Sequence, residues 1–282
     1  MRPPDPSSDI ASTGASAAES LTLGSAASPR PTPPVRPVNE LPEVGPPTTN
    51  LSIPAVALAI GAHPDDIEFG CGATLAKWSR AGCAVHHLVL TDGSKGSWDP
   101  GMDTAQLAAV RMHEATEAAG LLGSQSVEFL GRTDGELRNG PEERRAVCRA
   151  IRRIRPDVVL SHDPWRRYRL HPDHRNAGFI VTDAIVAAGD PLFFPEEGLT
   201  PHRPAILLLW EADVPNHVES VRGFEQLKLA ALLAHRSQHR NAMGIGAETT
   251  ETDFSRQLIA QLERHGAIAG VSRGESFHAL TL

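Results

Sequence analysis

Short runs of apolar residues recur along the chain from residue 55 onward, rich in valine, leucine, isoleucine and alanine. Runs of this length and composition are typical of strands in a sheet that is covered on both faces. Five strands are predicted on this basis: Ala55–Ile60, Ala84–Leu90, Val127–Leu130, Asp157–Ser161 and Ala205–Trp210.

Segments with a helical spacing of apolar residues lie between and after these strands. Over residues 141–155, for example, Val147, Ile151 and Ile154 fall on one side of a helix and arginines on the other. Because strands and helices alternate, we expect an α/β fold with a Rossmann-like, doubly wound and mainly parallel sheet. Ligands of such sheets bind beyond the carboxyl ends of the strands. The predicted helices are Cys71–Ala81, Thr104–Leu121, Pro141–Arg155, Asp173–Ala187, Ser220–His235 and Asp253–His265.

The first 50 residues differ in composition from the rest of the chain. They contain 11 of the 23 prolines, no aromatic residue and none of the 13 histidines. Ordering the backbone costs about 1–2 kcal/mol per residue, and this segment has little apolar surface to offset that cost. We therefore expect a disordered Pro/Ser/Ala-rich tail over residues 1–50 and one domain over residues 51–282.

Charge and cysteine content argue against several classes of protein. The formal net charge of −7 disfavours a general nucleic-acid-binding protein. The three cysteines, Cys71, Cys83 and Cys148, are too few and too widely spaced for a disulfide framework or a cysteine-rich zinc module. No apolar stretch approaches the roughly 18 residues of a membrane span, and the N-terminus lacks the apolar region of a signal peptide. The expected location is the cytoplasm.

Side chains that commonly bind metals follow the first predicted strand. His63, Asp65, Asp66 and Glu68 lie close together, and His63 and Asp66 are three residues apart, so one helical turn could aim both at one point. An imidazole and a carboxylate suit zinc or ferrous iron. The same segment also suits a plain turn in which an aspartate caps the following helix.

A pair of histidines follows the fourth predicted strand. His171 and His174 are three residues apart where a helix is expected to start. The pair alone is a weak signal, but both segments follow strands and should therefore project from the same edge of the sheet. His63, Asp66 and His174 would then supply three protein ligands and leave a fourth position for water, as in catalytic zinc sites. Asp65 and His171 are left as acid–base candidates beside that water.

These residues belong to two longer motifs, AHPDDIE at residues 62–68 and HPDHRNAG at residues 171–178. In this order and spacing, the motifs resemble those of the PIG-L/LmbE-like family of zinc-dependent de-N-acetylases, which remove acetyl groups from N-acetylglucosaminyl compounds. The resemblance runs from about residue 53 to the end of the chain. Glu68 follows the aspartate pair after one intervening residue, so its part in orienting His63 is left open. Weaker matches are TDG at 91–93, RxxE at 111–114, LGRTDGEL at 130–137 and HRSQ at 235–238.

The resemblance implies a role for each matching residue. His63, Asp66 and His174 match the zinc ligands of the family, Asp65 matches its general base, and His171 matches the histidine that stabilises the oxyanion. The implied fold is the LmbE-like deacetylase fold, and the implied cofactor is Zn²⁺, with Fe²⁺ as the alternative. The implied reaction removes an acetyl group from a small N-acetylglucosamine-type conjugate by attack of a zinc-bound water. General chemistry is consistent with these roles. Zinc lowers the pKa of bound water to about 7, and the tetrahedral oxyanion that forms when water attacks the amide needs a hydrogen-bond donor.

Other residues are weaker candidates. Arg111 matches the family arginine that reaches towards the substrate, although it also suits a surface position on a helix. Asp134, in a turn after a strand, could bind sugar hydroxyls, and Trp98, in a Gly-containing loop, could stack on a sugar. His235 and His239 are four residues apart, and we expect them to share a helix face rather than to bind a metal.

Other functions remain open at the level of sequence. An amidase of the mycothiol-conjugate type, or another hydrolase, could use the same metal site. A binding protein with a vestigial site is disfavoured because every candidate ligand and the base are present. The arginine-rich loop 165–169 beside His171 would either favour an anionic substrate or form a solvated basic loop. The sequence specifies neither the acetylated substrate nor the oligomeric state.

Overall fold

The computed structural model describes residues 45–246 and 248–282, so most of the predicted tail lies outside the described residues. Thr48–Thr49 form a short strand, β1, that pairs in parallel with a strand formed by residues 217–220. The sheet therefore begins before residue 51, which is where the sequence predicted that the domain starts.

Five parallel strands form the centre of the domain. Their order in the sheet is β4-β3-β2-β5-β6, and every neighbouring pair is parallel. Within these five strands the chain starts at β2 in the middle, builds outwards through β3 to β4, and then returns to β5 and β6 on the other side of β2. The doubly wound arrangement predicted from the sequence is confirmed. The strands are β2 (Val56–Gly61), β3 (Ala84–Thr91), β4 (Ser126–Arg132), β5 (Val158–His162) and β6 (Ile206–Trp210).

Two further strands, β7 (His217–Ser220) and β8 (Gly274–Thr281), were not predicted. Strand β8 pairs antiparallel with both β6 and β7 and extends the sheet on one side. The helix predicted over residues 220–235 begins only at Glu225. Ser220 ends β7, and the chain then turns through Gly223, which has a φ of 91°.

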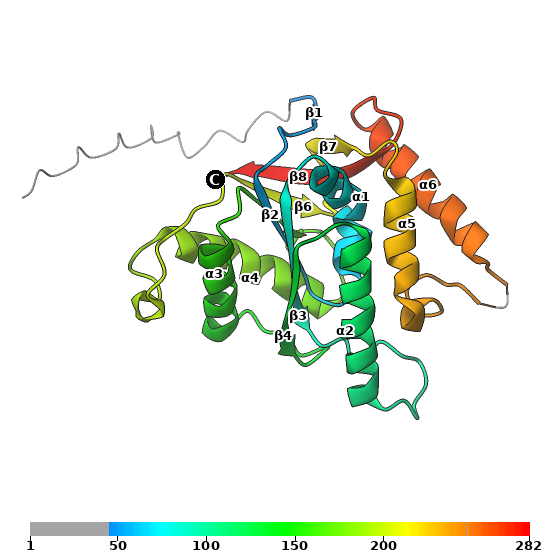
Figure 1. Cartoon of the computed structure of the whole chain (residues 1–282), viewed down its shortest axis with the longest axis horizontal. Coiled ribbons are helices and arrows are strands. Elements are labelled where there is room, and N and C mark those ends of the chain that lie inside the picture. Colours follow the sequence, from blue (N-terminus) through cyan, green and yellow to red (C-terminus); the bar gives the residue numbers. More distant parts are fainter. Residues whose placement is uncertain (1–44, 247) are drawn as a thin grey trace, which may run out of the picture. The chain divides into compact units, whose positions relative to one another are not determined.

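Six α-helices within the described residues cover the sheet. In Figure 1, α3 and α4 lie together on one side of the central strands, and α1, α2 and α5 lie on the other, with α6 next to α5. Helix α1 begins at Asp66, earlier than predicted, so its first turn carries part of the first motif. The helices are α1 (Asp66–Arg80), α2 (Thr104–Leu121), α3 (Pro141–Ile154), α4 (Pro172–Gly189), α5 (Glu225–Ala234) and α6 (Glu251–Ala267). The part of the chain that the structure describes also contains two short 3-10 helices, η1 (Pro195–Glu197) and η2 (Arg236–Gln238).

The burial of β2 on both faces explains why its sequence is an uninterrupted apolar run. Leu58 and Ile60 are fully buried in the core that α3 and α4 share with one face of the sheet. Ala57 and Ala59 are fully buried in the core that α1 shares with the other face. Because alternate side chains of a strand point to opposite faces, a strand covered on both sides must be apolar throughout.

Helix α1 is kinked at Cys71, where φ is −149° and ψ is 17°. The carboxylate of Glu275 on β8 accepts hydrogen bonds from two backbone N–H groups just after the kink, at 3.1 and 2.7 Å. Lys228 on α5 forms a buried ion pair with Glu275 and donates to the carbonyl oxygen of Phe69, just before the kink. The Lys228–Glu275 ion pair thus links the two halves of α1. The first half begins with Asp66.

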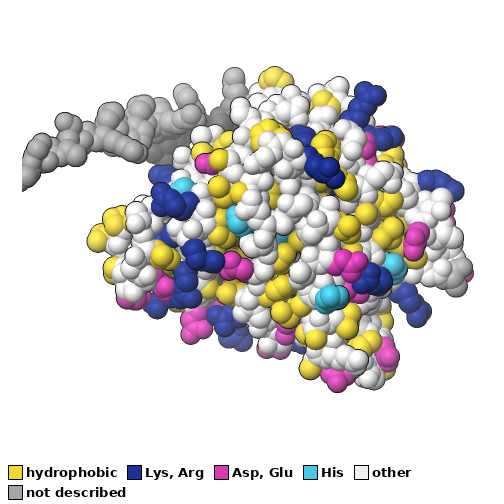
Figure 2. All heavy atoms as spheres, in the orientation of Figure 1, with side chains coloured by type: hydrophobic (Ala, Val, Ile, Leu, Met, Phe, Trp, Pro, Cys, Tyr) yellow, Lys and Arg dark blue, Asp and Glu magenta, His cyan; other side chains and the backbone are white. Residues whose placement is uncertain are grey.

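No helix in the part of the chain that the structure describes is long and apolar enough to cross a membrane. The three cysteines are buried and unbonded to one another. On the face shown in Figure 2, basic and acidic side chains are interspersed.

Candidate active site

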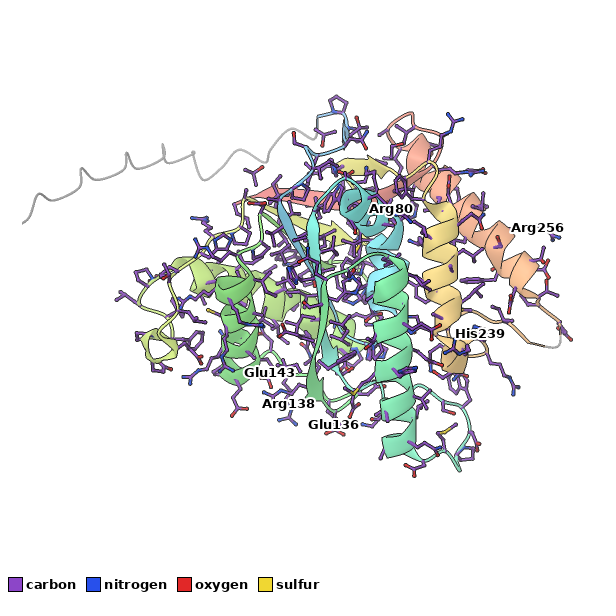
Figure 3. The ribbon with its side chains drawn as sticks, in the orientation of Figure 1. Arg80, Glu136, Arg138, Glu143, His239 and Arg256 are labelled. Atoms are coloured by element: carbon purple, nitrogen blue, oxygen red, sulfur yellow. The ribbon has the colours of Figure 1, made fainter. Side chains whose placement is uncertain are left out.

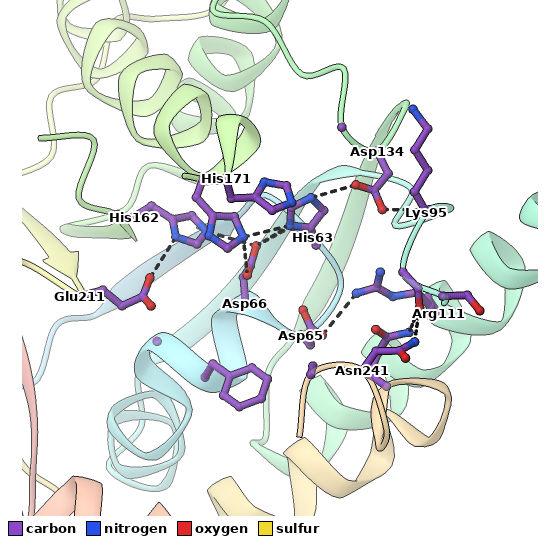
Figure 4. A pocket seen from close by; sticks show the side chains of 18 of the residues that line it. His63, Asp65, Asp66, Lys95, Arg111, Asp134, His162, His171, Glu211 and Asn241 are labelled. Carbon is purple, nitrogen blue, oxygen red and sulfur yellow. Dashed lines mark hydrogen bonds and ion pairs between the residues drawn. The ribbon is translucent and has the colours of Figure 1, made fainter. Parts of the chain in front are cut away.

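A cavity of about 610 Å³ lies at the carboxyl ends of the parallel strands. It is centred on β2 and β5, where the order of the strands reverses, which is the position that doubly wound sheets use for ligands. Figure 4 shows side chains converging there from segments far apart in the sequence. All the site residues named from the sequence line this cavity: His63, Asp65, Asp66, Arg111, Asp134, His171 and His174.

The side chains of His63, Asp66 and His174 meet at one point. His63 Nδ1 lies 3.2 Å from His174 Nε2 and 3.3 Å from Asp66 Oδ2. His174 Nε2 lies 3.3 Å from Asp66 Oδ1. His63 follows β2, Asp66 starts α1, and His174 lies in the first turn of α4, so the fold brings two motifs together across 111 residues.

Three overlapping groups of side chains could hold a metal ion at this place. They include two residues that the sequence did not single out, His162 at the end of β5 and Asp173 in the first turn of α4. A polar residue at the end of an apolar strand was the available signal for His162. The candidate groups are His63 with His171 and His174, Asp66 with His162 and His174, and His63 with Asp134 and Asp173.

Two carboxylates orient the ring of His63. Its Nε2 lies 3.1 Å from Asp134 Oδ1 and 3.3 Å from Asp173 Oδ2, which leaves Nδ1 facing Asp66. Burial lowers the pKa of His63, but the hydrogen bonds to Asp134 and Asp173 more than offset this, and the pKa lies well above its usual value. Glu68 does not contribute, because its carboxylate lies 3.4 Å from His235 instead.

Asp65 is held by a buried arginine. It precedes α1 with a φ of 122°, a backbone conformation that residues other than glycine rarely adopt. The guanidinium of Arg111 lies 3.3 Å from Asp65 Oδ2 and donates to the carbonyl oxygens of Pro64, at 2.6 Å, and Gly93, at 2.9 Å. A side chain on Gly93 would collide with this guanidinium. Arg111 is therefore an interior residue, not a surface residue of α2.

The environment separates the pKa values of the two neighbouring aspartates. Burial raises the pKa of Asp65, and the charge of Arg111 only partly opposes this. Burial also raises the pKa of Asp66, but His174 and His162 more than offset it and hold the pKa well below its usual range. Two adjacent carboxyls with opposite shifts are typical of a site in which one exchanges protons and the other stays ionised.

His171 lies directly before α4, with its ring against those of His63 and His174. The ring centroids are 4.7 and 4.5 Å apart, respectively. Burial and the nearby histidines lower the pKa of His171. The imidazole is therefore neutral at neutral pH and retains one N–H group that can donate a hydrogen bond.

The wall of the cavity contains Trp98, whose side chain is exposed and unpacked, with 86% of the residue's surface accessible. The arginine-rich loop contributes little free charge. Arg166 lies 3.3 Å from Glu211, and Arg167 lies 3.0 Å from Asp213. Arg169 is also paired with Glu211. The interpretation of this loop as a site for an anionic substrate therefore loses its main support.

The weaker motifs contact one another beside the cavity. Glu114 of RxxE accepts hydrogen bonds from the backbone N–H and hydroxyl of Ser237 in HRSQ, at 2.9 and 2.6 Å. The predicted helix-face pairing of His235 and His239 is wrong, because α5 ends at Ala234 and the chain turns. His235 is fully buried. The ring of His239, which is labelled in Figure 3, donates a hydrogen bond to the carbonyl oxygen of Leu233.

Comparison with known proteins supports these observations. Residues 58–185 match the family described as "PIG-L: GlcNAc-PI de-N-acetylase". The chain is 37% identical over 184 residues to diacetylchitobiose deacetylase of Thermococcus kodakarensis, covering 64% of this chain and 69% of that protein. It is 32% identical to 1D-myo-inositol 2-acetamido-2-deoxy-alpha-D-glucopyranoside deacetylase of Streptomyces avermitilis, covering 61% of this chain and 66% of that protein. Its structure resembles N,N'-diacetylchitobiose deacetylase from Pyrococcus horikoshii, with a TM-score of 0.74, 31% identity, and 81% and 84% of the two chains covered.

Proposed function

Because the chain belongs to the PIG-L family of de-N-acetylases, we propose that it hydrolyses the acetamide of a neutral N-acetylglucosamine conjugate, with a zinc ion held by His63, Asp66 and His174. The observation that carries this proposal is the close approach of the donor atoms of three side chains from two distant motifs.

The spacing of these donors suits a tetrahedral metal ion. An ion about 2.0–2.1 Å from each donor requires the donors to lie about 3.3 Å apart. The two imidazole nitrogens lie 3.2 Å apart, and each lies 3.3 Å from one oxygen of the Asp66 carboxylate, His63 Nδ1 from Oδ2 and His174 Nε2 from Oδ1. Two imidazoles and one carboxylate suit zinc, and ferrous iron is the alternative. A zinc ion bound there would lower the pKa of a water ligand to about 7 and would polarise the amide carbonyl.

The protein residues around this point have complementary tasks. Asp65, whose pKa burial raises, accepts a proton from the attacking water and returns it to the leaving amine. His171, neutral and adjacent, donates its N–H to the carbonyl oxygen as negative charge develops there. Asp134 and Asp173 keep the ring of His63 in a fixed orientation.

The charges of the cavity favour a neutral sugar. Asp65, Asp66, Asp134 and Glu211 line it, and the lysine and arginine side chains that line it among the described residues are Lys95 and Arg111. The arginine is already bonded to the protein, and the lysine pairs with Glu136. A phosphate or carboxylate on the substrate would therefore meet little free positive charge. The two curated relatives are named for a disaccharide and an inositol-linked sugar, both neutral.

The test combines metal analysis with product release. We expect about one zinc per chain, and acetate release from N,N'-diacetylchitobiose that a chelator abolishes and zinc restores. Asp65→Asn should keep the metal and lose at least about 100-fold in turnover. His174→Ala should lose the metal.

Several outcomes would contradict the proposal. If the wild-type protein retained no metal after zinc was added back, the proposed metal site would be wrong. Metal binding with cleavage of a mycothiol-type amide, and no acetate release from sugar conjugates, would favour the amidase. Faster turnover of N-acetylglucosamine 6-phosphate than of the neutral sugars would overturn the assignment of a neutral substrate.

A further inference from the structure

His162, the last residue of β5, connects the core of the sheet to one of the proposed metal ligands. The residue is fully enclosed, with 1% of its surface exposed. Its Nε2 lies 3.1 Å from Asp66 Oδ2, and its Nδ1 lies 3.0 Å from the indole nitrogen of Trp210. The two residues are opposite one another on the parallel strands β5 and β6.

The partners of His162 determine which ring nitrogen carries the proton. An indole N–H can only donate a hydrogen bond, so Nδ1 must accept and cannot carry a hydrogen. Arg169, another obligate donor, also lies 3.1 Å from Nδ1. The carboxylate of Glu211 lies farther away, 3.6 Å from Nδ1, which is beyond hydrogen-bond distance. The hydrogen is therefore on Nε2, from which it points to the Asp66 carboxylate. The backbone N–H of Ala62 also approaches Nε2, but at 3.4 Å it is the weaker contact.

This arrangement distinguishes the two oxygens of Asp66. Oδ2 accepts hydrogen bonds from His162 and, at 2.7 Å, from the backbone N–H of His63. Oδ1 lies 3.3 Å from His174 Nε2. Oδ2 also lies 3.3 Å from His63 Nδ1. The hydrogen bonds of the protein thus converge on Oδ2, whereas Oδ1 is directed towards His174, the second histidine of the proposed metal site.

Trp210 is itself fixed by close packing. It is 1% exposed, and its indole lies flat against Gly70 of α1, where an added Cβ would be only 2.5 Å from Cδ2. Gly70 follows Asp66 by one turn of the helix, so the helix that carries Asp66 also clamps the indole. The contacts form a closed path from Asp66 through His162 and Trp210 back to α1.

We propose that His162 is a positioning residue for Asp66, and that Trp210 sets its tautomer so that it donates to the metal-binding carboxylate. This inference rests on the proposed metal site. Hydrogen-bond partners of metal ligands typically contribute 10–100-fold to metal affinity. Zinc affinity should therefore depend on a donor at residue 162, even though this residue is not a ligand of the proposed His63–Asp66–His174 site.

The test measures the zinc dissociation constant of the full chain by competition with a chromogenic zinc chelator. His162→Leu removes the donor, and the constant should rise 10- to 100-fold. In His162→Gln, the amide NH₂ can donate to Asp66 while the amide oxygen accepts from Trp210, and the constant should return to within a few-fold of wild type. Trp210→Phe removes the indole N–H but leaves Arg169 as a donor to Nδ1, and should give an intermediate loss.

His217→Leu is the matched control, because His217 is a fully buried strand histidine outside the cavity. Its zinc constant should be unchanged, whatever its melting temperature. Nitrogen NMR of the metal-free protein should show the Nε2–H tautomer for His162. Unchanged affinity in His162→Leu, no rescue by glutamine, or an equal loss in His217→Leu would overturn the inference. If the wild-type protein bound no zinc, the proposed function itself would be wrong.

Discussion

The guanidinium of Arg111 lies 3.3 Å from the carboxylate of Asp65 and hydrogen-bonds the carbonyl oxygen of the residue before it. A backbone with a φ of 122° is strained for an aspartate, and strain of this kind costs about 1–3 kcal/mol. The arginine therefore braces both the backbone and the side chain of the proposed base. This contact is distinct from the substrate-reaching role that the family resemblance implied.

Replacement of Arg111 should separate these two roles. If the arginine holds Asp65, Arg111→Ala should lower kcat about 10- to 100-fold with little change in KM, and Arg111→Lys should restore part of kcat. Steady-state kinetics on a neutral sugar conjugate measures both constants. A rise in KM with unchanged kcat would show instead that the arginine mainly binds substrate.

Removal of the exposed indole at the cavity wall should weaken substrate binding. Aromatic contacts contribute about 0.5–1.5 kcal/mol beyond the area they bury, so Trp98→Ala should raise KM for a sugar conjugate about 2- to 10-fold. The melting temperature should not change, because the side chain packs against little. Tyr168→Ala is the control, since Tyr168 is 92% exposed but is not among the residues that line the cavity. Equal effects of the two substitutions would argue against stacking at Trp98.

The buried pair of Lys228 and Glu275 should be important for stability. Lys228→Met leaves the Glu275 carboxylate buried without its cation, which typically costs about 3–5 kcal/mol in the free energy of unfolding. Lys95→Met is the control, because Lys95 pairs with Glu136 at the surface and such pairs contribute about 0–1 kcal/mol. Urea unfolding measures both. A loss below about 1 kcal/mol for Lys228→Met would mean that water or a rearrangement replaces the lysine.

Acid should destabilise the protein partly through Glu219. Burial raises the pKa of this carboxyl, but the hydrogen bond from His217 and the charge of Lys77 more than offset it, so the pKa lies below its ordinary value of 4.5. A carboxyl with a lowered pKa in the folded state stabilises that state above about pH 4.5, and the contribution disappears as the pH falls through the folded pKa. The melting temperature of wild type should therefore fall more steeply below pH 4.5 than that of Glu219→Gln. Parallel curves would exclude Glu219 as a source of the acid sensitivity.

The sequence by itself determined the central fold. Strands β2, β3, β5 and β6 are covered on both faces, and strands in that environment are mostly apolar, which leaves a plain signal even though β3 carries His86 and His87. Strands β7 and β8 were missed because they carry interior polar residues such as His217, Glu219 and Glu275, whose partners come from other segments. Such partners are not visible in a linear pattern, so the antiparallel extension of the sheet could not be predicted.

The same distinction holds for the site. His63 with Asp66, and His171 with His174, are only three residues apart in the sequence, so the short turn that leads into each helix brings the pair together and the sequence could identify them. The contacts of Arg111 with Asp65, of Asp134 with His63, and of His162 with Asp66 join residues from different strands and helices. Only the tertiary structure decided these contacts, because the direction and burial of each side chain depend on how the elements pack. Packing therefore determined which groups fix the orientation of residues that the sequence could already name.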